Sequence, residues 1–172
     1  TESVAVYSLP YKVFEVLLVL PTFFMNAVYP VLVRHMEESK EKLKSIFSRS
    51  LIFLVGSGIL VGLIGLVFAP FIINILGGSE FSQSINVMKI LVVPIVLFYL
   101  TAPLSWLIVT LGYQKFLPWI YAISASFNMI ANFIFIPKYS FYAASIITVV
   151  SELIILILLI FTARKSWKLK YA

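Results

Sequence analysis

The 172-residue chain is 62% hydrophobic and only 12% charged, with a formal charge of +6. Soluble domains carry about 25% charged residues, so this composition excludes an ordinary soluble core and predicts an all-α integral membrane helical bundle. The sequence contains no Cys and no Asp, which excludes disulfides, thiolate chemistry and aspartate-rich metal sites. Its basic residues flank apolar stretches, a placement that indicates membrane topology and contact with membrane lipids rather than with nucleic acid.

Five apolar segments are long enough to cross a bilayer, and we predict one membrane domain over 1–172. The spans are 12–33, 51–75, 88–111, 118–137 and 141–163. Lys and Arg are divided unequally between the connections: ten fall on one side, in 34–50, 112–117 and 164–172. The other side holds only Lys138, in connections 1–11, 76–87 and 138–140. By the positive-inside rule, we expect an N-terminus outside the plasma (inner) membrane and a cytoplasmic C-terminus.

The first span carries polar and proline positions that an apolar membrane helix does not require. Lys12 and Glu15 are three residues apart and share one helix face, where they would form an ion pair near the outer interface. Pro21 and Pro30, on either side of Asn26, either kink the helix for packing or release carbonyl groups toward a polar cavity. Both interpretations stay open at this point.

The next connection and the spans that follow add basic and glycine positions. After Arg34, residues 34–50 are expected to form a cytoplasmic amphipathic loop, with a short helix lying on the membrane surface. In the second span, glycines at 58 and 62 permit close approach of another helix. Lys89, at the start of the third span, either extends to lipid head groups or lines an external vestibule that attracts an anionic head group.

The last two spans carry the most informative polar residues. Ser124, Asn128 and Asn132 recur every four residues and form one polar stripe, which lipid could not satisfy. The segment 141–161, FYAASIITVVSELIILILLIF, holds Glu152 near its middle, where an ionisable group must face protein or water. A short turn at 137–140 makes these spans an antiparallel hairpin, so the stripe and Glu152 lie at similar depths. We interpret this network as helix packing or, alternatively, as a site of ion coupling or substrate contact.

No catalytic or metal-binding constellation can be assembled from the sequence. The only histidine, His35, lies in a basic stretch with no Cys or Asp to complete a metal or nucleophilic set. Glu37, Glu38 and Glu41 alternate with lysines, as on a solvated surface. We therefore expect neither an enzyme nor a cofactor. Kinked spans beside buried polar groups favour a transporter, and a non-transporting membrane scaffold subunit is the alternative of another class.

Several short motifs resemble the polysaccharide-transport proteins, the Wzx-like branch of flippases for O-antigen and other lipid-linked oligosaccharides in the MOP/MATE superfamily. The closing part of that family has an N-x-x-x-N helix, then I-P-x-Y-G, G-A-A and A-T-x-x-S/T-E. This sequence is similar over Asn128, Asn132, 136–140, Ala143, Ala144, Thr148, Ser151 and Glu152. It departs from the pattern at Ser140 and Tyr142, where glycines are usual.

The resemblance implies the C-terminal half of a two-lobed protein of 12 to 14 helices, whose N-terminal lobe is missing from this chain. It implies alternating-access transport of a polyprenyl-diphosphate-linked oligosaccharide for cell-surface polysaccharide biosynthesis, in partnership with the polymerase machinery. Lys12, Arg34 and Lys89 would then be the cations available to the diphosphate, and Glu152 a coupling or packing acid. A MATE-type exporter of drugs or other cations is the alternative within the superfamily, and these residues alone are not expected to transport.

Overall fold

The computed structural model describes residues 2–171, and these are almost entirely helical. The four long helices are α1 (Glu2–Glu38), α2 (Lys40–Gly77), α3 (Ser82–Thr110) and α4 (Leu117–Tyr171), with short 3₁₀ turns at Ser79–Phe81 and Gln114–Phe116. All four are long and apolar enough to cross a membrane. Large side chains such as Val67, Phe133 and Phe161 are exposed along the outer faces of the bundle, as expected of surfaces that contact lipid. The predicted all-α membrane bundle is confirmed.

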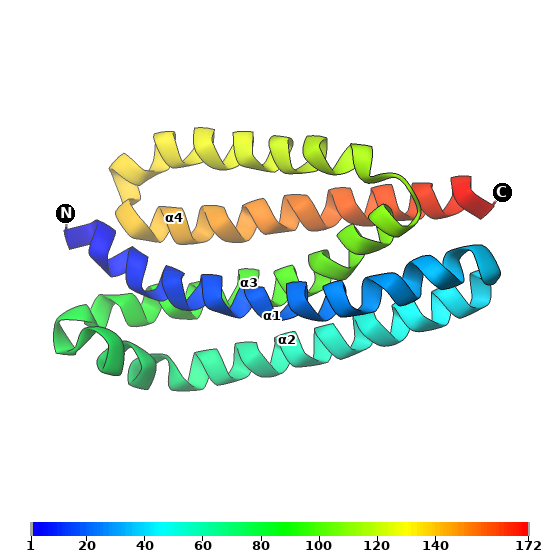
Figure 1. Ribbon diagram of the computed structural model, residues 1–172. Coiled ribbons are helices and arrows are strands. Elements are labelled where there is room, and N and C mark those ends of the chain that lie inside the picture. Colours follow the sequence, from blue (N-terminus) through cyan, green and yellow to red (C-terminus); the bar gives the residue numbers. More distant parts are fainter. Residues whose placement is uncertain (1, 172) are drawn as a thin grey trace.

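The two last predicted spans both lie in α4, on either side of a reversal at Ser140. Ser140 has φ 54° and ψ −140°, outside the helical region, and Figure 1 shows the chain turning back on itself there. A positive φ favours glycine over an L-residue with a side chain, so Ser140 holds a strained turn. Pro137, which cannot continue a helical hydrogen-bond ladder, precedes the turn.

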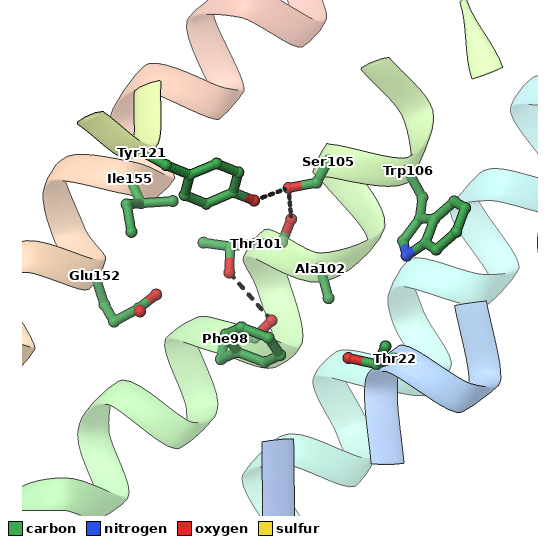
Figure 2. A pocket seen from close by; sticks show the side chains of 9 residues that line it. All are labelled: Thr22, Phe98, Thr101, Ala102, Ser105, Trp106, Tyr121, Glu152 and Ile155. Carbon is green, nitrogen blue, oxygen red and sulfur yellow. Dashed lines mark hydrogen bonds between the residues drawn. The ribbon is translucent and has the colours of Figure 1, made fainter. Parts of the chain in front are cut away.

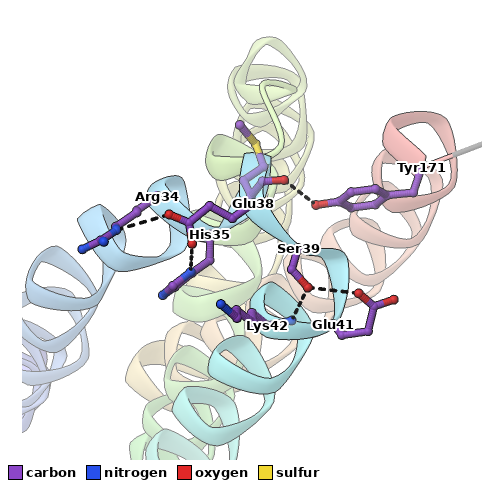
Figure 3. Close-up of polar contacts among 8 residues, drawn as sticks. Arg34, His35, Glu38, Ser39, Glu41, Lys42 and Tyr171 are labelled. Atoms are coloured by element: carbon purple, nitrogen blue, oxygen red, sulfur yellow. Dashed lines mark hydrogen bonds and ion pairs between the residues drawn. The ribbon is translucent and has the colours of Figure 1, made fainter.

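The connection between α1 and α2 differs from our expectation of a loop with a separate surface helix at 34–50. Only Ser39 separates the two helices, and residues 40–50 are the first turns of α2, continuous with its membrane-spanning part. Ser39 is extended and its Oγ accepts a hydrogen bond from the N–H of Lys42, 3.4 Å away, which caps the helix (Figure 3). Leu43 is fully buried, so one face of this segment packs into the bundle, whereas Lys42 and Lys44 are exposed.

The end of α4 lies against this connection. The Tyr171 hydroxyl donates a hydrogen bond to the Met36 carbonyl over 3.2 Å, and Lys40 lies over the Tyr171 ring. Figure 3 shows Glu38 between Arg34 and His35, which donate to its two carboxylate oxygens over 3.4 and 2.8 Å. The hydrogen bond from His35, with a smaller contribution from Arg34, lowers the pKa of the Glu38 carboxyl below its usual 4.5.

Two of the three prolines of α1, Pro10 and Pro21, free carbonyl groups that accept hydrogen bonds from hydroxyl groups of α3. A proline leaves the carbonyl four residues earlier without its helical N–H donor, so Pro10 frees Val6 and Pro21 frees Leu17. Ser84 Oγ donates to the Val6 carbonyl over 2.7 Å, and the Tyr99 hydroxyl donates to the Leu17 carbonyl over 3.1 Å. The interpretation that Pro21 frees a carbonyl toward a polar cavity is therefore wrong: that carbonyl joins α1 to α3.

Tyr99 also fills the closest contact between α2 and α3. It is 2% exposed, and a Cβ placed on Gly58 would lie 2.7 Å from the Tyr99 Cβ. Gly62 similarly lies against Val96. Small residues of this kind let two helices approach closely, as the glycine spacing predicted. One tyrosine thus connects α1, α2 and α3.

Candidate functional site

A cavity of about 700 Å³ lies between the first half of α1 and both halves of α4. Tyr7, Tyr11 and Phe14 line it from α1, because residues three or four apart share a helix face. Its α4 lining comes from the polar stripe of the first half and from the facing residues of the second half. The polar members on α4 are Tyr121, Ser124, Asn128, Asn132, Thr148, Ser151 and Glu152.

A chain of hydrogen bonds runs along the wall that α4 provides. Asn132 Nδ2 donates to Asn128 Oδ1 over 2.8 Å, and Asn128 Nδ2 donates to Ser151 Oγ over 2.9 Å. Ser124 Oγ donates to the Ser151 carbonyl, also over 2.9 Å, so Ser151 joins the two halves of the hairpin. Across the cavity, the hydroxyls of Tyr7 and Thr148 are 3.3 Å apart. These contacts hold the hairpin together and also orient its amides toward the cavity.

Glu152 lies where this cavity adjoins a smaller one of about 190 Å³ between α1, α3 and α4. Figure 2 shows its carboxylate extending from α4 toward α3, with Thr101 and Phe98 in front of it. On the other side of this small cavity, the Tyr121 hydroxyl and Ser105 Oγ are 2.8 Å apart, and Ser105 Oγ also donates to the Thr101 carbonyl.

The Glu152 carboxylate has an oxygen without a protein partner. Its Oε2 is buried and has no hydrogen bond within the described residues, and the same holds for Asn132 Oδ1. A charged oxygen removed from water costs several kcal/mol unless it is paired. The site therefore has capacity for a cation, a water molecule or a ligand hydroxyl at two acceptors, one from each half of the hairpin.

The structure brings together three of the predicted site residues and separates the others. Asn128, Asn132 and Glu152 all line the larger cavity. Asn26 is exposed and instead borders a different hollow of about 370 Å³ between α1 and α3, beside Thr22.

The four remaining predicted residues lie on exposed faces of the helices. Lys12 and Glu15 are exposed, and the ion pairs within residues 2–171 do not include them, so the interfacial pair expected from their spacing is not formed. Arg34 is exposed and pairs with Glu38, and Lys89 is exposed on α3. None of the four is among the described residues that line the two cavities beside Glu152.

Sequence reasoning missed the tyrosines of the site. Tyr7 and Tyr11 stack with their ring centroids 5.4 Å apart along the α1 wall. Tyr121 lies seven residues before Asn128, so it extends the same polar stripe by two helical turns. That spacing was available in the sequence, but an aromatic residue in an apolar span is more often a packing residue.

Comparison with known proteins identifies the family. The MatE family model matches residues 1–134, which is 134 of the 172 residues and includes Asn128 and Asn132. No curated protein and no solved structure matches the chain. The match ends before the Ser140 turn, so Glu152 lies beyond it. The match covers most of the chain, and the chain belongs to the MatE family: it is a multi-pass membrane transporter and not an enzyme.

Proposed function

We propose that the chain is one lobe of a flippase for polyprenyl-diphosphate-linked oligosaccharides, in which a polar cavity is exposed to each side of the membrane in turn. The observation that carries this proposal is the lining of the cavity between α1 and α4. It offers tyrosine hydroxyls, amides and aliphatic hydroxyls, with Glu152 as the single carboxylate among the described lining residues. Sugars present many hydroxyls and flat apolar ring faces, which such a lining suits.

In this proposal, the negatively charged diphosphate of the substrate binds outside the large cavity. The described lining of the large cavity contains no Lys or Arg, so the sugars occupy the cavity and the diphosphate lies outside it. Lys12 and Lys89 lie near the beginnings of α1 and α3, at one end of the bundle, and Arg34 lies at the other end. They are the exposed cations available to a diphosphate at either membrane face, and the basic end is assigned to the cytoplasm.

A second candidate is export of organic cations. Three tyrosines beside a carboxylate without a partner, Glu152, are also suited to a cation, through the ring faces and the charge. The amides of Asn128 and Asn132 distinguish the two candidates, because an organic cation makes little use of an amide donor and acceptor pair. The oligosaccharide proposal therefore predicts that transport depends on both asparagines.

The test is translocation of a labelled polyprenyl-diphosphate oligosaccharide by the full-length protein in vesicles. Replacing Asn128 and Asn132 together by Ala is expected to slow translocation by on the order of tenfold, since each hydrogen bond contributes about 1 kcal/mol. The matched control replaces Asn74 and Asn86, exposed amides of α2 and α3, by Ala. Equal rates for the two double variants would contradict the proposal. Efflux of an organic cation in place of oligosaccharide translocation would favour the second candidate.

Glu152 is the acid through which a cation gradient could act in either case. We expect Glu152→Gln to transport at a rate that no longer responds to an imposed proton gradient, because the amide cannot exchange a proton. The rate is measured over a series of gradients beside the unsubstituted protein. A variant that follows the gradient as before would remove Glu152 from coupling and leave it a packing role.

A further inference from the structure

An apolar groove on the outside of the bundle shares none of its described lining residues with the polar cavity. It has a volume of about 610 Å³ and is enclosed by α2, α3 and the second half of α4. Its floor includes Leu107 and Ala163, both buried, and its half-buried walls are Leu51, Leu100, Leu104, Leu156 and Ile160. An open apolar channel of this kind on a membrane-facing surface can accept a hydrocarbon chain.

One end of the groove is strongly basic. Lys44 of α2 and Arg164 and Lys168 of α4 line it there, all exposed, and its described lining has no acidic residue. Ser48 and Trp167 complete this end with a hydroxyl and an indole. Basic pockets between membrane helices bind anionic lipid head groups, and Trp is enriched at the level of head groups.

The direction and length of the groove fit one lipid leaflet. The basic end lies near the C-terminus, at the end of the bundle where α1 meets α2 (Figure 1). Along α4 the lining extends from Leu156 to Lys168, twelve residues. At a rise of 1.5 Å per residue this is roughly 18 Å, close to the roughly 15 Å depth of one hydrocarbon leaflet.

We propose that this groove binds an anionic glycerophospholipid, with its phosphate at Lys44, Arg164 and Lys168 and an acyl chain along the apolar walls. Charge complementarity selects this occupant. A second copy of the chain would bring the same three cations against the groove, and a zwitterionic lipid would place its own cation beside them. The inference does not depend on the transported substrate, because the groove and the polar cavity share none of their described lining residues.

The experiment measures binding of phosphatidylglycerol and phosphatidylcholine to the delipidated full-length protein by native mass spectrometry. The groove variant changes Lys44, Arg164 and Lys168 to Gln. The control variant changes Arg49, Lys165 and Lys170 to Gln, which removes the same residue types from the same helices at exposed positions outside the groove. The groove variant is expected to bind phosphatidylglycerol at least about tenfold more weakly, since each basic residue near a lipid surface contributes roughly a factor of five. The control should bind it normally.

Four results would overturn the proposal, three of them concerning the cations and the identity of the lipid and one the apolar walls. The first is equal loss in the two triple variants, and the second is equal affinity of the unsubstituted protein for the two lipids. The third is a preference for a polyprenyl diphosphate over phosphatidylglycerol, which would make the groove a substrate path. Glycerol phosphate without acyl chains should bind far more weakly than phosphatidylglycerol, and equal binding would refute the role of the apolar walls. Should the triple variant not fold, phosphatidylglycerol binding is compared between two single variants instead: Lys168→Gln in the groove and Lys170→Gln as its control.

Discussion

The two sides of α1 illustrate two ways of packing a polar membrane helix. On one side, α1 meets α3 through buried hydrogen bonds, where Ser84 and Tyr99 occupy the carbonyls that Pro10 and Pro21 leave free. On the other side, the first half of α1 faces α4 across a cavity, where the hydroxyls of Tyr7 and Thr148 are 3.3 Å apart. On the first side, the freed carbonyl groups accept hydrogen bonds from the protein itself. On the second side, hydrogen-bond acceptors are left without a donor among the described residues. Stability should therefore reside in the first and transport in the second.

The largest loss of stability is expected beside Tyr99, the α3 residue of the satisfied side that also packs against Gly58 of α2. Gly58→Ala places a Cβ against the rigid base of Tyr99, 2.7 Å from its Cβ, and we expect a loss of about 1 to 3 kcal/mol of folding free energy. Gly56 lies on the same helix, but a Cβ added there would meet nothing within 4 Å, so Gly56→Ala should be neutral or stabilising by up to about 1 kcal/mol. Thermal unfolding of the purified variants gives both values. Equal effects would mean that α2 and α3 are packed less closely than described.

An effect of comparable size is expected at the hydrogen bond between Tyr99 and Leu17. Tyr99→Phe leaves the Leu17 carbonyl without a donor and should cost about 1 to 3 kcal/mol. In a Pro21→Ala background the new N–H at position 21 can donate to that carbonyl, so the same substitution should cost much less. A double-mutant cycle on thermal unfolding measures the coupling, and additive costs would show that the proline and the tyrosine do not share this carbonyl.

The composition and the lengths of the apolar runs were sufficient to predict the all-α membrane fold class. The runs of apolar residues identified the four described helices that are long and apolar enough to cross a membrane, and the positions of Gly58 and Gly62 identified the face of α2 that packs closely. The segment 34–50 was mispredicted because its alternating charges resemble a surface helix. Ser39 supplies a helix cap, and Leu43 is drawn into the core, so the charged turns continue the spanning helix instead.

The candidate site was predicted in part. A period of four identified Asn128 and Asn132, and the isolated charge identified Glu152, because both signals are local in the sequence. The residues that complete the cavities, such as Tyr7 and Ser105, come from other helices and depend on how those helices cross. Lys12 was assigned to the diphosphate for its charge, and in the described part of the chain it is exposed on α1 without the expected ion pair to Glu15.

The smallest effect on stability is expected at Glu152, although its effect on transport is expected to be large. Its Oε2 is buried and accepts no hydrogen bond within residues 2–171, so Glu152→Gln removes a charge that no described group compensates. The free energy of unfolding should therefore stay the same or rise slightly, whereas Asn128→Ala, which breaks the bond to Ser151, should lower it by about 1 kcal/mol. Both variants are measured by thermal unfolding beside the unsubstituted protein. A marked loss of stability in Glu152→Gln would place the acid with the packing residues, and the contrast between the two sides of α1 would then fail at the residue proposed to couple transport to a gradient.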